Sequence, residues 1–196
     1  MIYLNNYGWN DKLHQLKQES TYNSLTHGRI SIVHRTCYEV VSENGLFQCE
    51  LTGNMMYGKS DFELPCTGDW VLFQPFDEHK GIIVDMLPRE RTLYRKKNGT
   101  VADKQAIASY VDKAFIVQSL DDNFNVRRAE RFMIQMQEEN ISPVLVFNKA
   151  DLGFDRQKVE KQIRHIARQI PVFFTSIHQP QTILQLRESI SAGETV

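Results

Sequence analysis

The chain has 196 residues, of which 41% are hydrophobic and 24% are charged, and its formal net charge is −1. This composition is ordinary for globular proteins and excludes collagen, coiled coils and disordered tails, while the length suffices for one large domain or two small ones. No stretch approaches the roughly 18 consecutive apolar residues of a membrane span, and the N-terminus lacks the basic and apolar regions of a signal peptide, so we expect a cytoplasmic protein that does not bind membranes.

The first part of the chain predicts a small β-barrel behind an N-terminal arm. Residues 1–24 show no recognisable chemistry, and we expect them to pack as an arm on the barrel of residues 25–88. There, short stretches rich in Val, Ile, Phe and Tyr alternate with Gly, Asn, Asp and Pro, and Asn44-Gly45 is a strong hairpin signal. Five strands and one long connection fit an OB-fold, although SH3-like barrels have a similar strand count. The expected strands are residues 28–35, 37–43, 45–53, 69–76 and 81–87.

The three cysteines, Cys37, Cys49 and Cys66, all lie in this barrel segment. Their number is odd and no C-x-x-C occurs, so the sequence indicates neither a disulfide framework nor a zinc site. We expect buried, reduced thiols and no metal bound by this chain.

A basic segment follows the barrel. Residues 1–85 carry six Lys or Arg against eleven Asp or Glu, residues 86–104 carry six against two, and residues 105–196 carry eleven of each. We place a linker at residues 89–104, where cations beside a tyrosine could bind RNA phosphates and a stacked base. The alternatives are a solvated linker and arginines that pair with the carboxylates of the barrel. The candidate RNA contacts are Arg29, Arg35, Arg91, Tyr94, Arg95, Lys96 and Lys97.

Residues 105–196 change to an alternation of strands and helices. Continuously apolar strands between amphipathic helices predict a parallel sheet covered by helices, which binds ligands at the carboxyl ends of its strands. The expected strands are residues 111–119, 143–147 and 171–174. The expected helices are residues 125–140, one that carries Val159, Ile163, Ile166 and Ile170, and one that carries Ile183, Leu186 and Ile190.

The tetrapeptide Asn148-Lys149-Ala150-Asp151 directly follows the second of these strands. It matches N-K-x-D, the guanine-specificity motif of GTPases. The Asp151 carboxylate can accept from N1–H and the 2-amino group of guanine together, a donor pair that adenine lacks. The stem of Lys149 can lie over the purine face, and Asn148 can bind the base edge and tie the loop to neighbouring backbone. In the alternative interpretation the match is a coincidence and Asp151 caps the next helix.

A second polar segment, Thr175-Ser176-Ile177, ends the third strand at the same edge. GTPases carry there a short loop of Ser-Ala type, whose backbone N–H reaches the guanine oxygen. Short polar residues before a helix are also common caps, and Ile177 stands where the motif has Ala. The predicted guanine site consists of Asn148, Lys149, Ala150, Asp151, Thr175, Ser176 and Ile177.

Several segments together resemble the ribosome small subunit-dependent GTPase A family, the circularly permuted GTPases of small-subunit assembly. They are GRI, TGDWV, LPRERTLYRK, IASYVDKAFIVQSLDDNFNVRRAERF and VLVFNKADL, within residues 25–196. The resemblance implies an OB-fold followed by a GTPase domain whose base motifs precede its phosphate-binding loop, and then a zinc-binding domain. It also implies GTP or GDP with Mg²⁺ as ligands, the small ribosomal subunit and its rRNA as partners, and a monomeric full-length protein.

The phosphate-binding motif G-x-x-x-x-G-K-[ST] does not occur in these 196 residues. The resemblance therefore implies that residues 105–196 form the guanine-recognition half of the GTPase domain and hold no catalytic residue, and that Zn²⁺ binds outside this chain. We expect this chain alone to bind GTP weakly and not to hydrolyse it. A phosphate loop shortly after Val196 would support a GTPase. Without one, the alternative is an OB-fold RNA-binding module with an α/β scaffold.

The resemblance also predicts that the three strands lie side by side. The strand at residues 111–119 would then form an open edge of the sheet. Open edges pair readily with other chains, so we expect this chain to self-associate through that edge.

Overall fold

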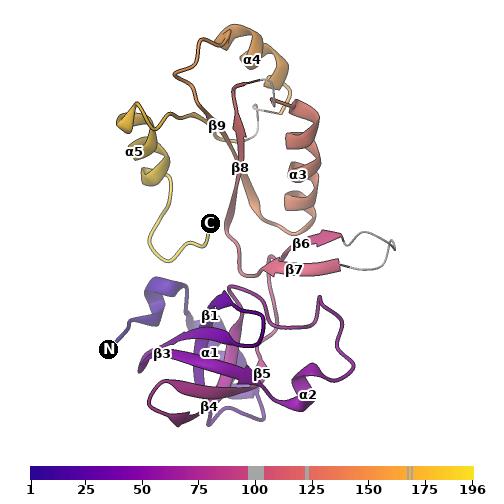
Figure 1. Cartoon of the computed structure of the whole chain (residues 1–196), viewed down its shortest axis with the longest axis vertical. Coiled ribbons are helices and arrows are strands. Elements are labelled where there is room, and N and C mark those ends of the chain that lie inside the picture. The colour runs from indigo at the N-terminus through magenta and orange to yellow at the C-terminus, as the bar shows by residue number, and fades with distance from the viewer. Residues whose placement is uncertain (97–103, 122–123, 167, 169) are drawn as a thin grey trace. The chain divides into compact units, whose positions relative to one another are not determined.

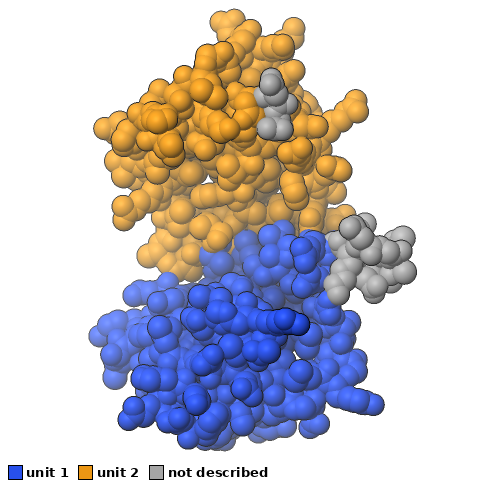
Figure 2. Space-filling view, in the orientation of Figure 1, with its two compact units in different colours: residues 1–111, 195 blue, residues 112–194, 196 orange. Residues whose placement is uncertain are grey.

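The computed structural model describes residues 1–96, 104–121, 124–166, 168 and 170–196 (Figure 1). It contains two compact units, of which unit 1 comprises residues 1–111 with Thr195 and unit 2 comprises residues 112–194 with Val196 (Figure 2). The division lies at residue 111, beyond the expected start of the α/β half at residue 105.

Unit 1 is built on a closed five-stranded barrel with the order β1-β2-β3-β5-β4, in which β4 closes onto β1 and β3 runs parallel to β5. Along β3, Phe47 and Cys49 point inward and Gln48 and Glu50 point outward, which is the period-two pattern of a half-buried strand. The predicted barrel is confirmed. Its strands are β1 Thr26–Val33, β2 Tyr38–Ser42, β3 Gly45–Leu51, β4 Trp70–Asp77 and β5 Lys80–Met86, with α2 Gly53–Met56 in the long connection.

The cysteines are free thiols. Burial raises the pKa of both Cys49 and Cys66 to about 12, so these two remain protonated, whereas Cys37 is only half-buried.

The N-terminal arm packs on the barrel. It consists of the short helices η1 Leu4–Tyr7 and α1 Asp11–Glu19. The Asn10 side chain caps α1 by accepting from the Leu13 backbone N–H at 3.1 Å. Leu4 and Leu13 are buried in one cluster with Trp70 and other barrel residues, so the arm extends the core of unit 1.

In the part of the basic segment that the structure describes, a strand lies on each side of residues 97–103. Strand β6 Leu93–Lys96 pairs antiparallel with β7 Lys104–Ala108. The chain after β7 returns to the barrel, where the Ser109 N–H donates to the Thr67 carbonyl at 3.0 Å. Gly68 permits this approach, because its φ is +94° and a Cβ there would lie 2.3 Å from the Ser109 carbonyl oxygen. These contacts place residues 104–111 in unit 1.

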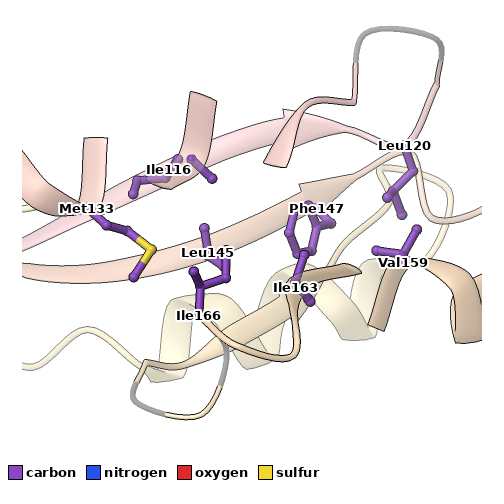
Figure 3. Close-up of a cluster of buried hydrophobic side chains, with 9 residues drawn as sticks. Ile116, Leu120, Met133, Leu145, Phe147, Val159, Ile163 and Ile166 are labelled. Atoms are coloured by element: carbon purple, nitrogen blue, oxygen red, sulfur yellow. The ribbon is translucent and has the colours of Figure 1, made fainter. Parts of the chain in front are cut away.

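Unit 2 is a three-stranded parallel sheet of order β10-β9-β8, with α3 and α4 packed on one hydrophobic cluster (Figure 3). Met133 of α3 and Ile163 of α4 contact this cluster together with Leu145 and Phe147 of β9. The predicted parallel sheet is confirmed, and β8 is one of its edge strands. The elements are β8 Lys113–Ser119, α3 Val126–Glu138, β9 Ser142–Asn148, α4 Arg156–Ile163, β10 Val172–Phe174 and α5 Pro180–Glu188.

The fourth helix is shorter than predicted. It ends at Ile163, so Ile166 and Ile170 lie beyond it, although both still pack on the cluster. The apolar pattern continues past the end of the helix because the turns that follow it place Ile166 and Ile170 on the same core.

Among the described residues, no helix combines the length and apolar character that crossing a bilayer requires. In the same part of the chain, no three His, Cys, Asp or Glu side chains gather in a way that could hold a metal ion.

Candidate functional site

The carboxyl ends of the three strands of unit 2 bring the predicted guanine residues together. Ser119 at the end of β8 pairs with Asn148 at the end of β9, and Thr175 directly follows β10. Two backbone hydrogen bonds link the loops, from the Leu120 N–H to the Asn148 carbonyl at 2.9 Å and from the Ala150 N–H to the Thr175 carbonyl at 3.0 Å. The two polar segments therefore form one edge.

Asn148 is held by the second polar segment. The buried Thr175 hydroxyl donates to Asn148 Oδ1 at 3.3 Å, and the Thr175 N–H donates to the Phe147 carbonyl at 2.8 Å. Since the amide oxygen of Asn148 accepts within the protein, its NH₂ group is the part with donors to offer a ligand.

Asp151 is oriented by Ser176. The buried Ser176 hydroxyl donates to Asp151 Oδ1 at 2.5 Å, and this hydrogen bond is the main reason that the pKa of Asp151 lies below its usual value. Ser176 is itself fixed, because its N–H donates to the Thr182 hydroxyl and its Oγ accepts from the His178 N–H, each at 3.0 Å. The Asp151 side chain remains exposed and ionised.

Asp151 does not cap the following helix. The N-cap of α4 is Asp155, whose Oδ1 accepts from the Lys158 backbone N–H at 3.0 Å. The helix-cap interpretation of Asp151 is therefore wrong, and its carboxylate is left for another role.

Lys149 makes an ion pair that sequence reasoning missed. Its ammonium lies 2.7 Å from Asp121 Oδ2, and the other oxygen of Asp121 accepts from the Ser119 hydroxyl at 2.8 Å. The backbone of Lys149 is left-handed, with φ +62°, which sets the direction of its side chain. The one hint in the sequence was that Ser119 and Asp121 lie at the end of the first strand of the sheet, but the approach to Lys149 depends on strand register. Ile177, by contrast, is 76% exposed.

The donor set of this edge fits a guanine base. A carboxylate, an amide NH₂ and an exposed lysine stem are the groups that can accept from N1–H and the 2-amino group, donate to the base edge and cover the purine face. The edge is therefore suited to recognising a base.

Two of the predicted RNA contacts, Arg29 and Tyr94, are buried within unit 1. Arg29 is 8% exposed, donates to the Gly68 carbonyl at 2.9 Å and lies over the Trp70 ring. Tyr94 is also 8% exposed, and the ammonium of Lys104 lies 4.0 Å from its ring centroid. The structure corrects both assignments, because a buried guanidinium cannot reach phosphates and a covered ring cannot stack on a base.

The other predicted RNA contacts differ in accessibility. Arg35 and Arg95 are exposed, and Arg95 Nε donates to the Gln105 side chain at 2.9 Å. Arg91 is half-buried and donates to the Val111 carbonyl at 3.1 Å. Lys96 ends β6, and Lys97 lies outside the described residues.

A closed barrel followed by a parallel sheet is the fold that this chain shares with circularly permuted GTPases. The chain is similar to the crystal structure of YloQ, a circularly permuted GTPase, with a TM-score of 0.58 and 20% identity over 88% of this chain and 59% of that chain. It is also similar to YjeQ from Thermotoga maritima, with a TM-score of 0.62 and 21% identity over 85% of this chain and 57% of that chain.

The sequence model of the RsgA GTPase family matches residues 86–196, and the chain belongs to this family. It is 73% identical over 190 residues to small ribosomal subunit biogenesis GTPase RsgA 1 of Bacteroides thetaiotaomicron, covering 97% of this chain and 54% of that protein. It is 33% identical over 192 residues to the RsgA of Methanosarcina acetivorans, covering 96% and 50%. The chain thus spans about half the length of the curated relatives it matches.

Proposed function

We propose that this chain is the barrel and guanine-recognition part of a GTP-binding and GTP-hydrolysing factor in small ribosomal subunit maturation. The observation that carries the proposal is the exposed Asp151 carboxylate, which Ser176 orients beside Asn148 at the carboxyl edge of the sheet. The names of the relatives, which are small ribosomal subunit biogenesis GTPases, support it.

In this proposal the edge selects the base of the nucleotide. Each Asp151 oxygen has two lone pairs, so Oδ1 can accept from Ser176 and from the base at once. The Asn148 NH₂ group donates to the base edge, and Lys149 covers one face of the purine. Bound nucleotide would bring phosphates and Mg²⁺, which the rest of the protein must hold. The Zn²⁺ site stays a prediction for a domain outside these residues.

The RNA-contacting role is assigned to cations of unit 1, of which Arg35 and Arg95 are exposed and Arg91 is half-buried. The candidates are now Arg35, Arg91, Arg95, Lys96 and Lys97, since Arg29 and Tyr94 are buried. The small subunit and its rRNA are the proposed partners, the cytoplasm is the proposed location, and the full-length protein is proposed to be a monomer.

The test is base specificity in the full-length protein that contains this chain. Asp151→Asn removes an acceptor that guanine needs and adds a donor that suits the 2-oxygen of xanthine. Because hydrogen bonds to a charged group contribute about 1.5–3 kcal/mol each, we expect GDP to bind about 100-fold more weakly and xanthosine diphosphate to bind more tightly, as measured by isothermal titration calorimetry.

The matched control is Asp155→Asn, which makes the same chemical change at the cap of α4. It should leave the preference for GDP unchanged. Equal GDP affinity for the two variants would contradict the proposal. Small-subunit binding by a protein that binds no guanine nucleotide would favour the alternative of an RNA-binding module with a scaffold α/β half.

A further inference from the structure

The sides of α3 and α4 that face away from the sheet are rich in cations. Both helices bury their apolar residues in the core of unit 2, Ala129 and Met133 from α3 and Val159 and Ile163 from α4. Exposed cations occupy the remaining faces at helical spacing. This α3–α4 basic face consists of Arg127 and Arg131 on α3 and Lys158, Lys161 and Arg164 on or directly after α4.

Three carboxylates near this face are already engaged, and the exposed Glu138 of α3 is the acidic residue that the face retains. Glu130 of α3 lies 2.5 Å from His165 Nε2 in the turn after α4, and Glu160 pairs with Arg156 at 2.8 Å. Asp155 is the cap of α4. Within the described parts of the chain, no ion pair or hydrogen bond engages the side chains of the five cations, so their charge faces solvent.

Helix stability does not explain Arg127 and Arg131 of α3, whereas Lys161 lies in the last turn of α4, where a positive charge favours the helix dipole. Neither helix has an acidic residue in its first turn, and Arg127 lies close to the N-terminus of α3, where a positive charge opposes the helix dipole. Arg127 and Arg131 are four residues apart, a spacing at which like charges repel. Because α3 keeps these two charges despite their repulsion, we expect this face to meet an anionic partner.

We propose that the α3–α4 basic face binds the phosphate backbone of RNA, as a second contact of the factor proposed above, on which this inference rests. Arginine and lysine at spacings of about 5–6 Å can neutralise several phosphates along one strand. A membrane is the less suitable partner, because a membrane-surface helix inserts its apolar face and these helices have packed theirs against the sheet.

The test measures the binding of this chain to a fluorescein-labelled RNA duplex of about 20 base pairs by fluorescence anisotropy over a range of salt. The variant carries Arg131→Gln and Lys161→Gln, one change in each helix. We expect the dissociation constant to rise about tenfold at moderate salt, and the slope of log affinity against log salt to become shallower by about two. A second variant, Arg127→Gln with Arg164→Gln, should behave in the same way.

The matched control carries Lys59→Gln and Arg187→Gln, which remove the same charge from the barrel loop and from α5. It should bind the duplex like the unmodified chain. The proposal would be overturned if both test variants kept the duplex affinity and the salt slope of the unmodified chain. It would also be overturned if the test variants and the control lost the same amount of duplex affinity. A loss of binding to phosphatidylserine vesicles without a loss of RNA binding would also overturn it and assign the face to membranes.

The outcome is separable from that of the proposed function. Duplex binding that depends on Arg131 and Lys161 in a protein without guanine preference would retain the basic face and reject the nucleotide role. If Asp151→Asn loses the preference for guanine but duplex binding does not depend on the five cations, the nucleotide role is retained and the basic face is rejected.

Discussion

The acidity of Asp151 depends on one neighbouring hydroxyl, that of Ser176. Because the hydrogen bond lowers the pKa of Asp151 in the native state, its carboxylate stays ionised to a lower pH than an ordinary aspartate. The stability it contributes is present above the unfolded pKa and is lost as the pH falls through the native value. In Ser176→Ala we expect the native pKa to rise toward its usual value, so that this loss begins at a higher pH. A ¹³C NMR titration of the carboxyl group measures the shift.

His178→Gln is the comparison for this prediction. The charge of His178 also lowers the pKa of Asp151, but it ranks well below the Ser176 hydrogen bond as a cause. We expect the His178 variant to shift the titration less than Ser176→Ala. If Ser176→Ala titrates like the unmodified protein, Ser176 does not orient Asp151.

Only some residues at the carboxyl edge of the unit 2 sheet could be predicted from the sequence. Asn148 and Asp151 were predictable because the motif is contiguous and follows a recognisable strand. Ser119 and Asp121 were not, because their approach to Lys149 depends on the register between β8 and β9. Arg29 was assigned to RNA because local composition does not reveal that barrel closure buries it.

At the scale of elements, a buried ion pair anchors the segment that leads into β6. Asp69 is fully buried, and Arg89 Nε lies 2.9 and 3.0 Å from its two oxygens. Arg89 also donates to the Phe62 and Leu64 carbonyls in the long barrel connection. Removing one member of such a pair leaves an unpaired buried charge, so Arg89→Met should lower the free energy of unfolding of unit 1 by about 3–5 kcal/mol. Urea unfolding followed by tryptophan fluorescence reports on it, because both tryptophans lie in unit 1.

Lys12→Met provides the control for the buried pair. Lys12 of α1 pairs with Glu90, the neighbour of Arg89 in the chain. Because this pair is exposed, its loss should lower the free energy of unfolding by only about 0–1 kcal/mol. Similar losses of stability for Lys12→Met and Arg89→Met would show that burial of the Asp69 pair does not strengthen the anchor.

The elements differ in how well local patterns predicted them. The barrel strands and the β8, β9 and β10 strands followed from runs of apolar residues, since strand periodicity is visible in a short stretch. The pairing of β6 with β7 was not predicted, because the many basic residues of this segment are typical of a linker and hide the fact that Tyr94 and Ala106 are buried. The end of α4 at Ile163 was also missed, because core packing continues through Ile166 after the helix stops.

At the scale of the whole molecule, the open side of β8 is the feature most able to join two copies of the chain. Within the described residues, β8 pairs on one side only, with β9, and Val117 on this strand is 60% exposed. Unpaired backbone N–H and C=O groups beside an exposed apolar side chain can pair with a strand of another chain. We expect light scattering after size-exclusion chromatography to show a mass that rises with protein concentration. Val117→Lys should reduce this rise, because a charged edge residue opposes strand addition, whereas Leu46→Lys, at a 56% exposed barrel position, should not. A constant monomer mass at high concentration for the unmodified chain would show that the β8 edge does not mediate association.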